Sequence, residues 1–300
     1  MTKGFIMAAI PHRQSINLGV LYGVLSALSF SIMIVLVKLI WQTLPTVEVL
    51  FFRFTISLIF FLPWFFWGSD FSFKIQDTVH YVIRILTALA ALFCVFYAVK
   101  FVPLIDALLL YNTAPLFVPI IAYVLLSAKI PKKTFLGIII GFIGVAFILH
   151  PGREILTLAA LIALASGFLS GLAMVNVRII SKTSTTKQMI FYFLSVSTVI
   201  LGLLSIFQWQ TPDGKYIWLL LLGIGVFGTF FQLFFTLSYV TAPVDIVAPL
   251  IFLIAVFGGI FDWIIWKHVP TIPSIVGGLC VVVGAIITLY FGKREVPLNK

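Results

Sequence analysis

Arg53 is the residue that most needs a chemical explanation, because it lies inside an apolar run long enough to cross a bilayer. Residues 46–67 read TVEVLFFRFTISLIFFLPWFFW. A guanidinium group keeps its charge, and at the centre of a membrane helix it costs about 3 kcal/mol on the mildest insertion scale. Arg53 therefore either extends to the outer interface or faces the bundle interior, where it meets an anionic group or a transport path. We favour the interior position, although Glu48 lies on a different helix face and is a poor partner for it.

Three carboxylates are candidates for proton coupling. Asp106 and Asp245 each follow a proline, Pro103 and Pro243, and fall in the first turn of a helix. A carboxylate at that position also complements the helix dipole, so a structural role is an equal alternative. Asp262 lies deeper in an apolar run. It either takes up a proton or pairs with a cation at the outer rim.

Other polar residues lie at membrane depth or near the ends of apolar runs. Rings and amides there either hydrogen-bond between helices or line a cavity for a metabolite with a flat or zwitterionic part. These candidates for the substrate path are Tyr97, Tyr111, Asn112, Asn176, Tyr192, Gln232 and Tyr239. Arg84 is a further path candidate, although a basic residue that opens a helix near the cytoplasm is more often an interfacial anchor. Lys38 and Arg178, near helix ends, are also expected to be interfacial anchors.

The elements that hold these residues are predicted to be transmembrane helices. Of the 300 residues, 62% are hydrophobic and 9% are charged, against about 25% charged in soluble domains. A helix needs about 20 apolar residues to span the hydrocarbon. Ten runs qualify, which predicts an all-α, multi-pass protein of the cell (inner) membrane. They are 18–40, 47–67, 80–100, 104–127, 134–150, 156–180, 188–207, 216–240, 244–266 and 273–292.

Several function classes are disfavoured by the same composition. The net charge of +10 comes from residues between the apolar runs, which indicates topology rather than nucleic-acid binding. The chain has no P-loop for ATP. Its four histidines are scattered and its two cysteines lie in apolar runs, so we expect no metal site, no disulfide and no cofactor. A membrane-embedded enzyme and a passive channel remain as alternatives to a carrier.

Basic residues also predict the orientation. With ten spans both termini lie on one side, and placing them inside gives eleven basic residues in inner segments against three in outer loops. Positive residues concentrate on the cytoplasmic side. We therefore predict that both termini are cytoplasmic, with tails at residues 1–17 and 293–300.

The chain also repeats itself at an offset of 140 residues. SALSFSIMIVLVKLIWQTLPTVEVLFFRFTIS at 26–57 aligns without gaps with SGFLSGLAMVNVRIISKTSTTKQMIFYFLSVS at 166–197. Gly137 matches Gly277 and Gly144 matches Gly284, whereas Arg53 matches the uncharged Phe193. Each repeat, 18–150 and 156–292, holds five spans, so the second enters the membrane from the opposite side. Inverted repeats are typical of secondary transporters, which bind substrate near the midplane between the repeats.

Longer motifs carry a resemblance to a known family. They are EVLFFRFTISLIFFLP (48–63), AVKFVPLIDALLLYNTAPLF (98–117), FLGIIIGFIGVAFILHPG (135–152), LSYVTAPVDIVAPL (237–250) and GGLCVVVGAIITLY (277–290). The chain resembles the EamA family of the drug/metabolite transporter superfamily over nearly its whole length. Arg53, Arg84 and the closing HPG are most similar to the branch of S-adenosylmethionine and riboflavin uptake carriers.

The resemblance implies a secondary active transporter for a small polar organic metabolite, working by alternating access in the lipid bilayer. Uptake of an S-adenosylmethionine-like metabolite is the leading expectation, and export of amino acids or related metabolites is the alternative. A monomer suffices, and the oligomeric state stays open. The family often ends its fourth and ninth helices with Gly-Glu, where this chain has Ser127-Ala128 and Lys267-His268. Any role of those glutamates is absent or replaced here.

Overall fold

The computed structural model describes residues 15–66, 73–127, 130–149, 158–242 and 244–292, and this part of the chain is helical. It contains ten helical spans long and apolar enough to cross a membrane, as predicted. Eight of them are single helices. These are α1 (Ile16–Ile40), α2 (Thr46–Phe66), α3 (Thr78–Ala98), α6 (Lys132–Leu149), α7 (Leu158–Ile180), α8 (Thr186–Ile206), α9 (Lys215–Thr241) and α12 (Ile272–Gly292).

The other two spans are broken near their middle. The fourth consists of α4 (Leu104–Tyr111) and α5 (Ala114–Leu126), and the ninth of α10 (Val244–Val247), the 3-10 helix η2 (Ala248–Phe252) and α11 (Leu253–Trp266). The apolar runs alone predict one continuous helix for each of these two spans. Pro115 in the first turn of α5 and Pro249 in η2 disfavour helical geometry in the residues before them. Broken helices are where secondary transporters bind their substrates.

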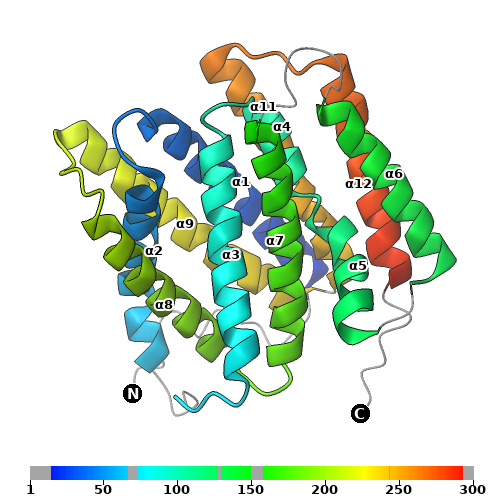
Figure 1. Ribbon diagram of the computed structural model, residues 1–300, viewed down its shortest axis with the longest axis horizontal. Coiled ribbons are helices and arrows are strands. Elements are labelled where there is room, and N and C mark those ends of the chain that lie inside the picture. The colour runs from blue at the N-terminus through cyan, green and yellow to red at the C-terminus, as the bar shows by residue number, and fades with distance from the viewer. Residues whose placement is uncertain (1–14, 67–72, 128–129, 150–157, 243, 293–300) are drawn as a thin grey trace.

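The helices pair in the pattern expected of two related halves (Figure 1). Helix α6 packs on α12, and α2 packs on α8, so these helices contact their own repeat counterparts. Helix α1 packs on α9, and its counterpart α7 packs on α3, so these two contacts are equivalent. The repeats are therefore interleaved rather than placed side by side.

The glycines matched by the repeat explain the contact between α6 and α12. A Cβ atom added to Gly144 would lie 2.5 Å from the carbonyl oxygen of Gly277, and one added to Gly284 would lie 2.5 Å from that of Gly137. Small residues allow such close approach of helix backbones. The glycines that match at the 140-residue offset therefore allow the close contact between these two helices.

Ser127 and Lys267, which are 140 residues apart, both end a helix in the left-handed conformation. Their φ angles are 52° and 58°, at the C-termini of α5 and α11. Glycine adopts this conformation at little energetic cost. The two departures from the Gly-Glu pattern thus fall where the backbone itself favours glycine.

The bundle has an Asp262 end and, opposite it, an Arg178 end. Helices α1 and α11 finish at the Asp262 end, where α2, α4 and α12 begin, and α7 finishes at the opposite Arg178 end, where α8 begins. The predicted orientation would place the Asp262 end outside. The repeat boundaries and the two tails also remain predictions, because residues 1–14 and 293–300 lie outside the described part of the chain.

Candidate substrate site between the repeats

The Arg53 side chain lies inside the bundle, as the favoured interpretation predicted. It is 1% exposed, and its guanidinium carbon lies 4.3 Å from the centre of the Phe54 ring. Gly228 of α9 makes room for it, since a Cβ atom there would lie 3.1 Å from Arg53 Nε. Glu48 forms no ion pair with Arg53 within the described residues, and its Oε2 instead accepts a hydrogen bond from the backbone N–H of Gln210 at 3.1 Å.

Two of the Arg53 nitrogen atoms are left without hydrogen bonds. Nε and Nη1 are buried and have no acceptor among the residues that the structure describes. Almost all buried polar groups in proteins are hydrogen-bonded, and an unsatisfied charged donor is especially costly. The arrangement fits a group that binds an acceptor from outside the chain.

A series of aromatic rings in contact with one another leads away from this guanidinium. Tyr111 of α4 interacts electrostatically with Arg53, and its hydroxyl lies close to Ser170 of α7. Phe30 of α1 stacks on Tyr111, with ring centres 5.6 Å apart and planes 10° apart. Phe231 of α9 lies 4.8 Å from Phe30. The site therefore combines one cation with flat apolar surfaces contributed by both repeats.

The two broken spans meet beside this group. Asn112, in the gap between α4 and α5, is 1% exposed and directs its amide nitrogen at the carbonyl oxygen of Ile251 in η2, at 3.4 Å. Its own Oδ1 has no hydrogen-bond donor in the described residues. Asn112 thus connects the two broken spans and leaves a second buried polar atom without a hydrogen bond in the described residues.

Arg84 lies on the Arg178 side of this site. It is half-buried between α3 and α8, where Nη1 donates to the Met189 carbonyl oxygen at 2.7 Å. Its guanidinium carbon is 5.2 Å from the Phe193 ring centre, and Phe193 is 5.2 Å from Phe54. Two edge-to-face rings thus connect Arg84 to Arg53. This position differs from the exposed interfacial anchor favoured from the sequence.

The remaining aromatic and amide candidates lie elsewhere in the bundle. Tyr97 packs on Phe101 near the Asp262 end. The Tyr192 hydroxyl donates to the Phe73 carbonyl oxygen near the Arg178 end, at 2.7 Å. The other three are Asn176, whose amide donates to the Leu172 carbonyl oxygen, Tyr239, which packs on Phe235, and Gln232 of α9. Their roles in the transport path remain predictions.

Asp262 is paired with Lys38, which corrects the expectation that Lys38 is an interfacial anchor. Lys38 is 8% exposed, and its ammonium nitrogen lies 3.0 Å from Asp262 Oδ1 and 4.6 Å from the Trp266 ring centre. Burial is the reason for the error, because α1 passes against α11 at this end. Arg178 is exposed, as predicted.

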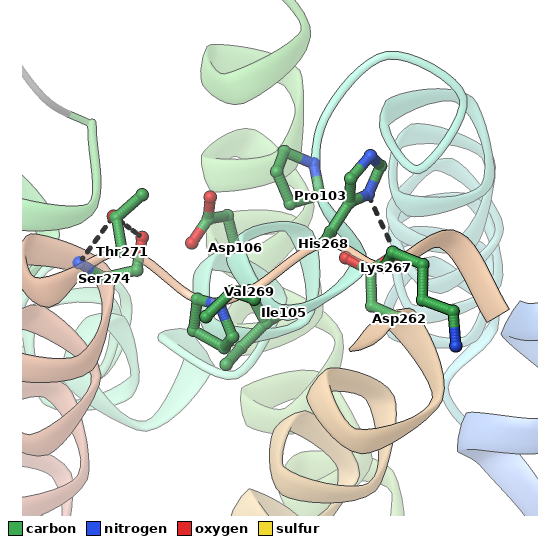
Figure 2. A pocket seen from close by; sticks show the side chains of 10 residues that line it. Pro103, Ile105, Asp106, Asp262, Lys267, His268, Val269, Thr271 and Ser274 are labelled. Carbon is green, nitrogen blue, oxygen red and sulfur yellow. Dashed lines mark hydrogen bonds and ion pairs between the residues drawn. The ribbon is translucent and has the colours of Figure 1, made fainter. Parts of the chain in front are cut away.

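Asp262 and Asp106 line one pocket of about 330 Å³ at the Asp262 end (Figure 2). Proton coupling by either residue remains a prediction. Asp245 lies in α10, but its side chain falls outside the described residues. Within the described part of the chain, no three His, Cys, Asp or Glu residues come together as a metal site.

Phe30, Ser170 and Phe231 were missed by sequence reasoning. Phe30 and Phe231 are two of 31 phenylalanines, and nothing in their spacing separates them from those that pack or face lipid. Gly228 carried a usable signal, because a glycine in a span marks close approach of another group.

The ten spans, the interleaved repeats and a buried site between them define a multi-pass membrane transporter. The model of the EamA-like transporter family matches residues 17–150 and 157–290, once for each repeat. The chain belongs to this family.

Curated relatives agree with that class. The chain is 31% identical over 271 residues to the pseudopaline exporter CntI of Pseudomonas aeruginosa (strain UCBPP-PA14), which covers 89% of this chain and 94% of the relative. It is 25% identical to the S-adenosylmethionine uptake transporter of Rickettsia felis, over 92% and 94% of the two chains. A crystal structure with 16% identity has a TM-score of 0.60 over 92% of this chain and 98% of the other. That last match shows the shared fold alone.

Proposed function

We propose that this chain is a secondary active transporter that moves a small metabolite across the cytoplasmic membrane by alternating access, with Arg53 binding an anionic group of the substrate. The buried guanidinium with two unsatisfied donors carries this proposal. A substrate carboxylate would supply two acceptor oxygens in the geometry that a guanidinium binds best. Binding would also remove the energetic penalty of the unpaired charge.

The rings beside Arg53 suggest the rest of the substrate. Phe30, Tyr111 and Phe231 offer surfaces on which a planar group stacks favourably. An S-adenosylmethionine-like molecule has both a carboxylate and a planar ring system, and the relative from Rickettsia felis is named as an S-adenosylmethionine uptake transporter. Uptake of such a metabolite is our leading candidate.

Export is the second candidate. The higher identity, 31%, is to a protein named as a pseudopaline exporter. The same Arg53 site serves either direction, because the imposed gradients decide the direction of net flux. Pseudopaline therefore belongs among the test compounds.

Substrate binding can be tested with the purified protein and four probes: S-adenosylmethionine, riboflavin, a mixture of amino acids and pseudopaline. We expect one probe to raise the melting temperature of the wild type, as a ligand that binds only the folded state must. The shift should disappear in Arg53→Met and persist in Arg178→Met, which removes an exposed arginine. Equal shifts in wild type and Arg53→Met would overturn the assignment of Arg53.

Transport of the probe that binds can then be measured in proteoliposomes. A coupled carrier accumulates substrate above its equilibrium level under an ion gradient and loses that accumulation when an uncoupler is added. Flux that only equilibrates under every imposed gradient would show a passive channel. Chemical conversion of the probe would instead show an enzyme.

A further inference from the structure

Asp262 joins three segments of the bundle at one carboxylate. Oδ1 holds the Lys38 ammonium group of α1 at 3.0 Å, and Oδ2 accepts the backbone N–H of Leu104, the first residue of α4, at 2.9 Å. The loop after α11 contributes His268, whose Nδ1 lies 3.4 Å from Oδ1. One residue of the second repeat thus holds two helices of the first repeat together.

The corresponding position at the opposite end lacks this junction. Arg178 corresponds to Lys38 at the 140-residue offset, and Ala122 corresponds to Asp262. Arg178 is exposed, and alanine offers no carboxylate. In an inverted repeat, the contacts that close one end have structural counterparts at the other end. Here the ion pair closes the Asp262 end only.

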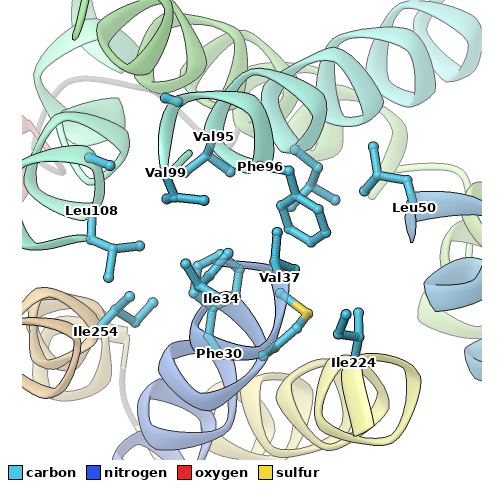
Figure 3. Close-up of a cluster of buried hydrophobic side chains, with 14 of the residues drawn as sticks. Phe30, Ile34, Val37, Leu50, Val95, Phe96, Val99, Leu108, Ile224 and Ile254 are labelled. Atoms are coloured by element: carbon cyan, nitrogen blue, oxygen red, sulfur yellow. The ribbon is translucent and has the colours of Figure 1, made fainter. Parts of the chain in front are cut away.

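Apolar side chains of several helices form a buried cluster around this part of α1 (Figure 3). Along α1, Ile34 and Val37 lie between Phe30 of the site and Lys38. From α3 come Val95 and Val99, and all four side chains are at most 2% exposed. We call these four residues the apolar plug. If a substrate passes along α1 between Arg53 and the Asp262 end, it displaces the plug.

We propose that Lys38 and Asp262 form the gate at the Asp262 end, and that Asp262 binds a proton from the adjacent pocket when the gate opens. The proton adds to the carboxylate oxygen Oδ1, while Lys38 keeps its own proton and moves away as an ammonium ion. This proposal rests on the transport function proposed above and deepens it, because it names the coupling ion as a proton and Asp262 as its site.

The surroundings of Asp262 suit this exchange. Breaking a buried ion pair leaves an uncompensated charge, which is strongly unfavourable. A protonated carboxyl removes the negative one, and the Trp266 ring, which already lies 4.6 Å from Lys38 Nζ, is a contact that the ammonium can keep without Asp262. The pocket gives the proton access from solvent. The titratable groups around it are Asp106 of α4, Lys38 of α1, and Lys267 and His268 of the loop after α11.

Gate opening can be measured without a known substrate, by the reaction of a buried thiol with a membrane-impermeant maleimide on whole cells. Val95→Cys places that thiol in the plug, in a background in which Cys94 and Cys280 are replaced by alanine. Thr211→Cys, in the exposed segment between α8 and α9, serves as the reference at each pH. Dividing by this reference corrects for the pH dependence of thiol reactivity.

We expect slow labelling of Val95→Cys near neutral pH and faster labelling as the pH falls. Asp262→Asn, which mimics the protonated carboxyl, should label at least about tenfold faster, equal to about 1.4 kcal/mol, and without pH dependence. Lys38→Met should also label faster. The double variant should exceed neither single one, since both remove the same interaction. Arg178→Met, which removes an exposed charge far from the gate, should leave the rate unchanged.

Three outcomes would overturn the proposal or part of it. Unchanged labelling in both Asp262→Asn and Lys38→Met would exclude the gate. A pH-independent wild type would exclude the proton site, and loss of the pH response in His268→Gln with Asp262 intact would assign the proton to His268 instead. Failure of the transport assay alone would leave these labelling results standing, whereas failure of the Thr211→Cys reference to label would show that the Asp262 end faces the cytoplasm.

Discussion

The two repeats share their backbone features and differ in their charges. Paired glycines, the left-handed residues Ser127 and Lys267, and a broken fourth helix recur at the 140-residue offset. Arg53 has Phe193 as its counterpart, and Asp262 has Ala122. The recurring features determine how the helices approach each other. The differing ones determine what binds inside and how each end is held closed.

The difference in charge between the repeats explains why we propose one substrate site, at Arg53, rather than two equivalent sites. In the structure, Arg53 and Phe193 do not occupy separate equivalent sites, because Phe54 contacts both. A charge in one repeat therefore lies beside the ring that replaces it in the other. A single guanidinium beside an aromatic ring can bind an asymmetric substrate in one orientation, which a symmetric pair of arginines could not specify.

The largest effect is expected at Arg53. Arg53→Met should reduce transport by about 30-fold or more, because it removes a buried charge-assisted contact worth about 2–5 kcal/mol in binding. The same substitution should raise the melting temperature in the absence of substrate, since an apolar side chain replaces an unpaired buried charge. Transport in proteoliposomes should fall, and the melting temperature of the same preparation should rise.

Arg178→Met is the matched control for the loss of an arginine, and it should change neither quantity appreciably. If Arg53→Met lowered the melting temperature instead, Arg53 would be a structural residue with a partner that stabilises it. Arg53 and Phe193 would then both be packing residues, and the two repeats would no longer differ in function at this position.

The scaffold can be tested by breaking the same contact from each repeat. Gly144→Val and Gly284→Val should each destabilise the fold by about 1–3 kcal/mol or more, because each new side chain meets backbone atoms of the facing helix. The two losses should be similar, since the positions are equivalent. Thermal unfolding in detergent measures both.

Gly202→Ala provides the control, because its Cβ would lie 3.2 Å from the edge of the Phe51 ring rather than against backbone. A large loss for only one of the two valine variants would show that the α6–α12 contact is not symmetric.

Sequence reasoning recovered the scaffold better than the site, for a physical reason. Spans and repeats can be recognised from apolar runs and matched glycines, because these residues determine local or periodic geometry. Arg53 was recognisable because a charge in an apolar run is costly wherever it points. The Lys38–Asp262 pair and the Phe30 wall depend on which faces of distant helices meet, and one sequence does not specify that. The helix breaks were missed although Pro115 and Pro249 marked them.

A smaller effect is expected at the two left-handed positions. Ser127→Gly and Lys267→Gly should each raise stability by a few tenths of a kcal/mol, because glycine relieves strain of about 1 kcal/mol while adding some freedom to the unfolded chain. The melting temperature should rise slightly in both variants. A higher melting temperature for Ser127→Gly and a lower one for Lys267→Gly would mean that the side-chain contacts of Lys267, at the edge of the Asp262 pocket, outweigh the relief of backbone strain.

The smallest effect concerns how α3 and its counterpart α9 begin. Asp77 caps α3 by accepting the backbone N–H of His80 at 3.3 Å, whereas α9 begins after Gly214 with no side-chain cap.

A side-chain hydrogen bond from His80 lowers the pKa of Asp77 below its ordinary 3.8. The unfolded chain then binds the proton more readily than the folded one. The stabilisation is therefore present above pH 3.8 and is lost as the pH falls through the lower folded value. Asp77→Ala should lower the melting temperature slightly at neutral pH, and its difference from wild type should shrink in acid. If the difference in melting temperature between wild type and Asp77→Ala stayed constant with pH, the Asp77 side chain would stabilise α3 without its negative charge. The starts of α3 and α9 would then differ in geometry alone.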